Sequence, residues 1–177
     1  HAMRPSFTVL ALAVVLALLA PVAAVAAEDR FVLGLGAFDG IQFDDGAGEA
    51  RFEYRSGAAL GESLGLSWSD GIAPLAGLLV NADGGVFGYG GLHADLRLTE
   101  RIVFTPMGGI GGYASGDGKD LGGVFQFIVG SELAYEFENR ARLGLYVTHI
   151  SNAGIHADNP GTESVLVSFS VPLDRLF

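Results

Sequence analysis

The sequence predicts an all-β protein, an eight-stranded antiparallel transmembrane β-barrel that follows an N-terminal signal peptide. Three observations carry this prediction. Residues 1–27 have the composition of a secretory signal. Past residue 27 no uncharged apolar run approaches the roughly 20 residues of a spanning helix, although 50% of the 177 residues are hydrophobic. In several later stretches apolar and polar residues alternate with a period of two, as in β-strands. Only helices and closed barrels satisfy the hydrogen bonds of every backbone group in lipid. The alternation therefore indicates a barrel over residues 28–177.

The N-terminal segment has the three parts of a signal peptide. Arg4 supplies the positive first region, residues 7–20 carry no charge, and a run of small residues follows at 23–27. We expect cleavage after Ala26 or Ala27. His1 and Ala2 precede the first methionine and do not enter the fold prediction. A retained N-terminal membrane anchor is the alternative, which the polar sequence directly after the small residues disfavours.

The composition limits the classes of function. Ten residues are Lys or Arg, one of them Arg4, so 9 basic and 20 acidic residues lie past residue 27, a formal charge of 9 − 20 = −11. Lys119 is the only lysine. A negative charge of this size argues against nucleic acid as a partner. The absence of cysteine leaves no disulfide framework and no thiolate metal site, and we expect no cofactor.

Alternation is clearest in two stretches. In residues 49–55, Ala50, Phe52 and Tyr54 share one face, and Glu and Arg side chains share the other. In residues 125–137, apolar side chains dominate the odd positions, and Gln and Glu lie on the even ones. We expect an apolar outer wall and a lumen filled by ion-paired side chains. The expected strands are 30–37, 48–56, 73–82, 84–97, 101–113, 121–137, 139–151 and 163–173.

An even number of strands puts both ends of the barrel chain on the same side. Short turns at 99–100 and 138–139 suit the periplasmic side, and an end at Phe177 after an alternating strand is common in outer-membrane barrels. Residues 57–72 fit less well, because this long connection contains Leu and Trp and is expected to hold a short helix or to lengthen a strand. A soluble β-barrel or sandwich with its core on the apolar face is the alternative fold.

A base, a hydroxyl and a carboxylate lie close together in the hairpin expected over residues 139–173. His149 and Ser151 are two apart, so on a β-strand they project from the same face as near neighbours. The polar stretch 152–162 is typical of a loop, which would return Glu163 beside them. These residue types are the general base, the nucleophile and the orienting carboxylate of a serine hydrolase triad.

Strand parity predicts that this group faces lipid. His149 and Ser151 continue the odd, apolar series of their strand, and Glu163 continues the apolar series of the next one. With both ends periplasmic, the strand of His149 ends at the extracellular side, beside the outer leaflet. Polar groups on a lipid-facing wall are costly unless they pair with one another. An enzyme that acts on a lipid ester accounts for them, since its substrate reaches the site by lateral diffusion.

The pattern His-x-Ser-Asn, with Glu fourteen residues after His149, resembles the active-site region of the lipid A 3-O-deacylases, the PagL-type outer-membrane acyloxyacyl hydrolases. The resemblance is close over residues 120–173, including the run at 130–135, whereas the N-terminal half matches only as generic barrel sequence. It implies hydrolysis of the 3-O-linked (hydroxy)acyl chain of lipid A in lipopolysaccharide, without a metal. Ser151 would be the nucleophile, His149 the general base and Glu163 the carboxylate that fixes the imidazole tautomer.

The resemblance also implies three further site residues. Asn152, next to the nucleophile, and Asn159, in the following loop, are candidates for the oxyanion hole, because amide donors stabilise a tetrahedral intermediate. Phe127 matches a family aromatic on the lipid-facing side of its strand and is a candidate for lining the acyl groove.

Other polar or glycine-rich segments have simpler interpretations. Residues 93–97 carry His, Asp and Arg on the polar face of their strand, where a lumenal hydrogen-bond network is expected. His156 and Asp158 are too few for a metal site in a loop. The glycines of residues 108–112 lack the lysine and the helix of a phosphate loop and are typical of a glycine-rich strand.

Two alternatives concern the function. His149 and Ser151 form, in the simplest interpretation, a strand end whose polar residues enter the headgroup zone. The chain would then be a non-enzymatic small outer-membrane barrel with a structural, adhesive or lipid-binding role. The oligomeric state is open, and a homodimer would shield the three polar side chains from bulk lipid.

Overall fold

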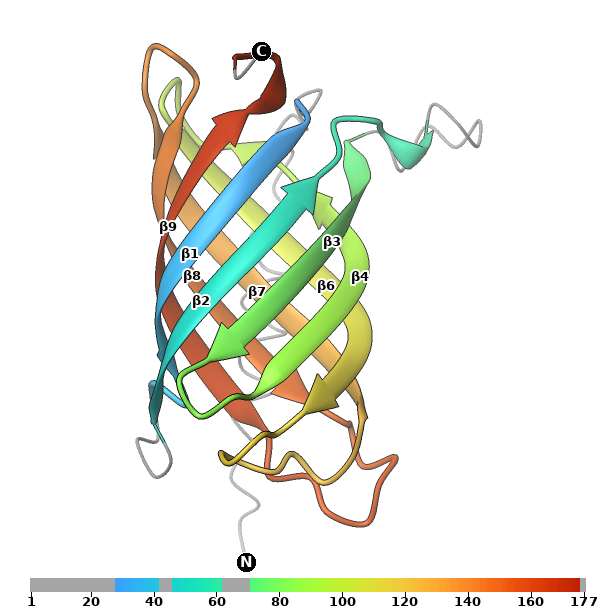
Figure 1. Ribbon diagram of the computed structural model, residues 1–177. Helices are drawn as coiled ribbons and strands as arrows, with labels where there is room; N and C mark the ends of the chain where they lie inside the picture. The colour runs from blue at the N-terminus through green and yellow to red at the C-terminus, as the bar shows by residue number, and fades with distance from the viewer. Residues whose placement is uncertain (1–27, 42–45, 62–70, 176–177) are drawn as a thin grey trace, which may run out of the picture.

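The computed structural model describes residues 28–41, 46–61 and 71–175 and shows a closed antiparallel β-barrel (Figure 1). Over these residues the strands pair with their neighbours along the chain, except that β4 does not pair with β5; β1 pairs with β9, and pairing between β4 and β6 completes the ring. The strands are β1 (Arg30–Phe38), β2 (Ala47–Arg55), β3 (Ile72–Asn81), β4 (Val86–Ala94), β5 (Leu96–Arg97), β6 (Ile102–Ala114), β7 (Phe125–Glu136), β8 (Arg142–Ser151) and β9 (Thr162–Pro172).

β4 and β5 act as one strand of the wall. Both pair with β6, and only Asp95 separates them along the chain. The described part of the chain therefore has 9 − 1 = 8 strands around its circumference. This count and the antiparallel pairing confirm the predicted eight-stranded barrel.

Two strands begin three or more residues later than predicted, and both differences have a local cause. β8 begins three residues late, because Arg140 lies in a tight turn with a φ of 65° and donates its amide to the Phe137 carbonyl oxygen. β7 begins four residues late, because Gly122 has a φ of 81°, which interrupts extended backbone. The predicted starts at 121 and 139 are therefore wrong, while the strands themselves are present.

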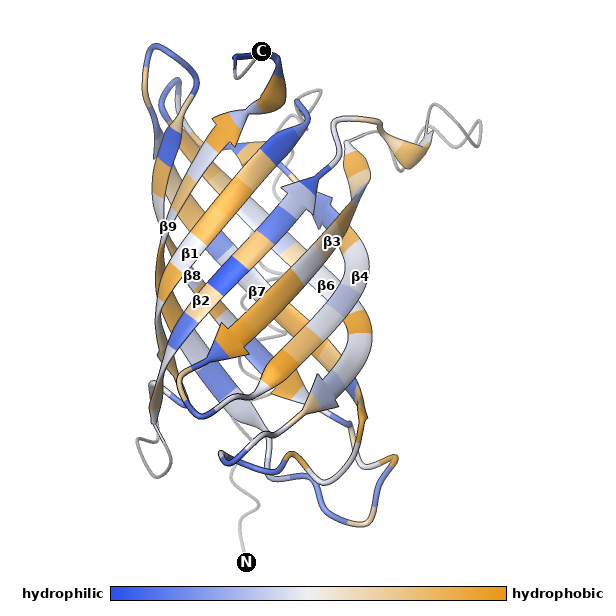
Figure 2. Cartoon of the chain, viewed as in Figure 1, coloured by the Kyte–Doolittle hydropathy of each residue, from blue (hydrophilic) through white to orange (hydrophobic). Residues whose placement is uncertain are grey.

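Hydrophobic and hydrophilic residues alternate along the strands (Figure 2), and exposed and buried side chains alternate in the same way. In β2 the four charged side chains from Glu49 to Arg55 are at most 4% exposed, whereas Phe52 and Tyr54 are exposed. The exposed large hydrophobic side chains of β7, β8 and β9 are Phe125, Val129, Leu133, Tyr135, Leu143, Leu145, Val167 and Phe169. The apolar outer wall and the charged lumen are as predicted.

A cluster of ion pairs and tyrosines fills the middle of the lumen. Glu53 accepts hydrogen bonds from Tyr89 at 2.6 Å, from Tyr146 at 2.7 Å and from Arg55 Nε at 2.9 Å. Arg55 also pairs with Glu132, and all five residues are buried. Buried charges are tolerated only when they are paired and hydrogen-bonded, so this closed network is what makes a charged lumen compatible with folding.

A second lumenal cluster lies near the β7–β8 turn. Arg142 donates to Asp95 at 2.6 Å and to Glu136 at 2.9 Å. Arg97 donates to Glu136 at 2.9 Å, and His93 Nδ1 lies 3.8 Å from Asp95 Oδ1. The lumenal network predicted for this segment is confirmed.

Two predictions lie outside the described residues. The expected signal peptide covers residues 1–27, and residues 62–70 make up most of the connection considered over residues 57–72. Among the described residues, no helix is long and apolar enough to cross a membrane.

Removing Glu53 should destabilise the barrel strongly. In Glu53→Ala the Arg55 charge keeps only Glu132, and two tyrosine hydroxyls lose their acceptor. We expect the free energy of unfolding, measured with denaturant in lipid vesicles, to fall by about 3–5 kcal/mol. Glu138→Ala is the control, because Glu138 is 88% exposed and pairs with Arg101 at the surface. Its unfolding midpoint should match that of the parent, and equal losses in both variants would contradict the role of the lumenal cluster.

Candidate active site

β8 and β9 bring His149 and Glu163 together on the outer wall. The two residues are direct partners in the antiparallel ladder, and His149 Nδ1 lies 3.0 Å from Glu163 Oε1. Their side chains are 29% and 22% exposed, whereas the neighbouring Thr148 and Ser164 are buried in the lumen. A carboxylate at this distance accepts a hydrogen bond from Nδ1–H, which leaves Nε2 as the free nitrogen of the neutral ring. We call His149 and Glu163 the outer pair.

Ser151 is the last residue of β8 and lies on the same outer face as the outer pair. It is half-buried and stands opposite Phe127 of β7. Within the described part of the chain no hydrogen bond joins its hydroxyl to His149. Catalytic hydrogen bonds are often long until substrate binds. The structure thus brings the three predicted side chains to one patch and joins two of them directly.

Gly161 lets the β8–β9 loop return closely against the imidazole of the outer pair. Its φ is 65°, a conformation that favours glycine. A Cβ atom at this position would lie 3.1 Å from His149 Cε1 and 3.7 Å from Nε2. The loop therefore closes over the ring edge that carries the free nitrogen. In the sequence, only its place just before β9 distinguishes Gly161 from the other glycines.

Asn152 is fully buried and fastens two loops together. Its Nδ2 donates to the carbonyl oxygens of Leu121 at 2.9 Å and of Asp158 at 2.7 Å. Its Oδ1 accepts a hydrogen bond from the Gly154 amide at 2.9 Å. Since both amide hydrogens have protein acceptors, this side chain has none left for an oxyanion. The geometry gives Asn152 a role in holding the loops, in place of the predicted oxyanion role.

Asn159 is held next to Ser151 by the backbone. Its Oδ1 accepts a hydrogen bond at 3.0 Å from the amide of Asn152, the residue that follows Ser151. Because an N–H donor requires an oxygen acceptor, this contact identifies which end of the side-chain amide is Nδ2. The residue is exposed, and its Nδ2 has no acceptor among the described residues. Of the two predicted amide donors, Asn159 is the one with N–H groups free for a ligand.

Phe127 borders the site on β7. It is half-buried and is the ladder partner of Ser151. Its ring meets Phe125 edge-on, with the ring centroids 5.2 Å apart. The two rings form an apolar surface beside the hydroxyl, on the outer face where an acyl groove was predicted.

An ion pair anchors the β6–β7 loop to the end of β1. Lys119 donates to Asp39 at 2.8 Å, and Asp39 is fully buried. The Thr162 hydroxyl lies 3.3 Å from the same carboxylate, and the Gly40 amide donates to the Glu163 carbonyl oxygen at 2.9 Å. These contacts hold the backbone on one side of Glu163. The only signal for them in the sequence is a single lysine in an acidic chain.

Two other segments considered as sites have structural roles. His156 packs against Gly123, where an added Cβ would lie 2.4 Å from the imidazole Cδ2. Within the described ranges, no group of three or more His, Asp or Glu side chains is arranged to hold a metal ion. Residues 108–112 lie in β6, and a Cβ at Gly109 would lie 2.5 Å from the Gly90 carbonyl oxygen, so close strand contact explains the glycines there.

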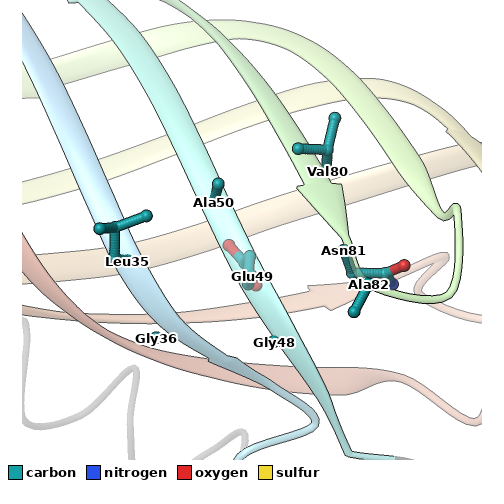
Figure 3. Close-up of a pocket in the computed structure, with 8 residues that line it drawn as sticks. All are labelled: Leu35, Gly36, Gly48, Glu49, Ala50, Val80, Asn81 and Ala82. Carbon is teal, nitrogen blue, oxygen red and sulfur yellow. The ribbon is translucent and has the colours of Figure 1, made fainter.

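A shallow cavity of about 420 Å³ lies on the wall formed by β1, β2 and β3 (Figure 3). Small residues open it, since Gly36, Gly48 and Ala50 lie between the larger Leu35 and Val80. None of the predicted site residues lines it. Within the sheet it is separated from β8 by β9.

A family model for Lipid A 3-O-deacylase (PagL) matches residues 46–172. The match spans 172 − 46 + 1 = 127 of the 177 residues. The chain belongs to this family. The finding confirms the resemblance seen in the sequence and extends it, because the match begins well before residue 120.

Solved structures support the fold. The chain is similar to the crystal structure of the outer membrane enzyme PagL, with a TM-score of 0.57 and 18% identity over 81% of this chain and 99% of that one. It is also similar to a structure from the de novo design of transmembrane β-barrels, with a TM-score of 0.56 and 8% identity over 84% and 100% of the two chains. At these identities both likenesses show the fold alone.

A search of curated proteins gave no match. Family and fold together make this an outer-membrane β-barrel protein.

Replacing Asn152 should loosen two loops and leave the barrel folded. Asn152→Asp keeps the acceptor for the Gly154 amide but sets a carboxylate oxygen against the carbonyl oxygens of Leu121 and Asp158. We expect amide hydrogen exchange in both loops to accelerate at least about tenfold, since each lost hydrogen bond contributes roughly 1 kcal/mol. Asn139→Asp, in the β7–β8 turn at the other end of the barrel, should leave that exchange unchanged. Unaltered exchange in Asn152→Asp would contradict the loop-holding role.

Proposed function

We propose that this protein is an outer-membrane serine esterase that hydrolyses the 3-O-linked (hydroxy)acyl chain of lipid A in lipopolysaccharide. One observation carries the proposal: His149 Nδ1 lies 3.0 Å from Glu163 Oε1, with Ser151 on the same outer face of the barrel. Membership of the lipid A 3-O-deacylase family supports the choice of substrate. Ser151 is the proposed nucleophile, His149 the general base and Glu163 the orienting carboxylate.

The proposed reaction has two steps. The Ser151 hydroxyl oxygen attacks the ester carbonyl carbon while its proton passes to His149 Nε2, which gives a tetrahedral oxyanion. The bond to the sugar oxygen breaks, and the sugar alcohol leaves with the proton from Nε2. Water, deprotonated by His149, then attacks the acyl-enzyme, releases the fatty acid and restores the Ser151 hydroxyl. Glu163 accepts the Nδ1 hydrogen bond throughout and stabilises the imidazolium that forms in each step.

The proposed position of the site is the outer leaflet. The β6–β7 and β8–β9 connections beside it are long, whereas β5–β6 and β7–β8 at the other end of the barrel are short turns. Outer-membrane barrels have long extracellular loops and short periplasmic turns. Two connections are exceptions here: the long β2–β3 connection at the periplasmic end and the short β3–β4 turn at the extracellular end. A lipid ester reaches the outward side chains by lateral diffusion, and Phe127 with Phe125 offers an apolar surface for its acyl chain.

The alternative, a non-enzymatic barrel with a structural, adhesive or lipid-binding role, does not require the three side chains to lie together. The contact within the outer pair and the family membership argue against it. The homodimer stays a prediction.

Removing triad members should abolish deacylation. We expect kcat to fall at least about 10³-fold in Ser151→Ala and in His149→Ala, and less in Glu163→Ala. The refolded barrel is incubated with lipid A in detergent, and mass spectrometry measures the loss of one hydroxyacyl chain. Ser131→Ala, an outward-facing serine of β7, is the matched control and should retain activity. Intact lipid A with the parent protein would refute the proposed function, and equal activity in the parent and Ser151→Ala would refute the nucleophile.

Asn159 is the proposed oxyanion donor through Nδ2. Asn159→Asp keeps the oxygen that accepts from the Asn152 amide, so the loop is preserved while the donor is lost. We expect kcat to fall about 10²–10³-fold with little change in KM, as for loss of one oxyanion donor. Parent-like kcat in Asn159→Asp, combined with a loss in Asn159→Ala, would assign Asn159 to loop structure alone.

A further inference from the structure

The lumen holds a second polar group directly behind the outer pair. Thr148 and Ser164 are partners in the β8–β9 ladder, one step from the outer pair, and both are buried. Arg51 donates to the Thr148 hydroxyl at 2.9 Å, and the Ser164 hydroxyl donates to Glu49. Each residue of the outer pair therefore adjoins, along its own strand, a hydroxyl that β2 holds from inside the barrel.

Glu49 and Arg51 are themselves an ion pair. Arg51 Nε donates to Glu49 Oε1 at 2.9 Å, and Nη2 lies 2.7 Å from the same oxygen. The two side chains are 0% and 1% exposed. Breaking this ion pair would leave a buried charge without a partner, which costs free energy. Together with the two hydroxyls they form a connected unit of four residues. We call this unit the lumenal clamp: Glu49, Arg51, Thr148 and Ser164.

Glycines on β1 let the clamp reach across that strand. β1 lies between β2 and β9, and Gly36 is the residue opposite Glu49 on it (Figure 3). A Cβ at Gly36 would lie 2.1 Å from the Val165 carbonyl oxygen, so β1 and β9 are in close contact there. Gly34 is the residue opposite Arg51. With no side chains at these two positions, the long side chains of β2 extend past β1 to β8 and β9.

We propose that Thr148 and Ser164 are positioning residues, through which the Glu49–Arg51 ion pair sets the geometry of the outer pair. This inference rests on the proposed function. Successive residues of a strand point to opposite faces, so a hydroxyl held in the lumen orients the neighbouring side chain on the outer wall. The outer pair lies close to the ends of β8 and β9, where backbone opens most easily. A displacement of about 1 Å at reacting groups lowers rates by up to roughly 10²-fold, so such support matters for catalysis.

The test compares hydroxyl deletions at two places on the same lumenal face. Thr148→Val and Ser164→Ala each remove one contact of the clamp and leave its ion pair in place. Ser168→Ala is the matched control, because Ser168 donates its hydroxyl to the buried Glu132 further along β9. Thr148→Ser and Ser164→Thr restore the hydroxyl. All variants are refolded into the same vesicles, and circular dichroism checks that each has formed the barrel.

We expect kcat on lipid A to fall about tenfold in Thr148→Val and Ser164→Ala with KM unchanged, because the outer wall that meets the lipid is intact. Ser168→Ala should stay within about twofold of the parent, and the hydroxyl-restoring variants should recover most of the loss. An equal fall in Ser164→Ala and Ser168→Ala would overturn the proposal, as would a loss confined to KM.

A second measurement does not depend on activity. The Nδ1 proton of His149 lies in the 3.0 Å contact with Glu163, so its NMR resonance in the refolded barrel reports that contact directly. We expect this resonance to shift or broaden in Ser164→Ala and to stay unchanged in Ser168→Ala. An unchanged resonance in both variants overturns the clamp. A parent protein that leaves lipid A intact refutes the proposed esterase function, while the NMR result still decides whether the clamp orients the outer pair.

Discussion

Charge pairing inside the closed barrel is the interaction on which the rest of this structure depends. A barrel in lipid turns its apolar side chains outward, so its interior receives the polar ones. Those charges are stable only if each finds a partner. Glu53 accepts from three donors and Arg142 donates to two carboxylates, and both networks join strands on different sides of the lumen. The ion pairs therefore stabilise the interior together with a buried apolar cluster that includes Phe87, Ile128 and Leu166.

Strand alternation couples this interior to the outer wall. Thr148 and Ser164 point into the lumen, and the adjacent residue on each strand, His149 or Glu163, points out. A lumenal hydrogen bond and an outward contact thus share a backbone. A hydrogen bond that restrains the backbone from the lumen therefore also restrains the outward side chain. For the proposed lipid-facing site this support matters, because lipid would offer the outer pair no fixed neighbours. The proposed lumenal clamp would supply this support from the inner face of the same two strands.

Local pattern was sufficient for much of the fold. The period of two in residues 49–55 and 125–137 predicts which side chains face outward, because pleating makes facing a property of neighbours in sequence. The same rule predicted the outward position of Ser151. Alternation did not predict where β7 and β8 begin. At Gly122 and Arg140 the backbone has a positive φ, which depends on turn geometry and leaves no trace in the alternation.

The sequence by itself determined the facing of the strands and the chemical identity of the outward polar residues, since both follow from local spacing. Only the tertiary structure decided which of them meet and what supports them. The 3.0 Å contact between His149 and Glu163 depends on the β8–β9 register, and Asn152 ties the loop between those strands to Leu121, 31 residues away in sequence. The β2 partners of Thr148 and Ser164, the donor Arg51 and the acceptor Glu49, are farther still along the chain. Contacts of this kind arise when the barrel closes and brings distant strands together, and no local pattern encodes which distant residues then meet.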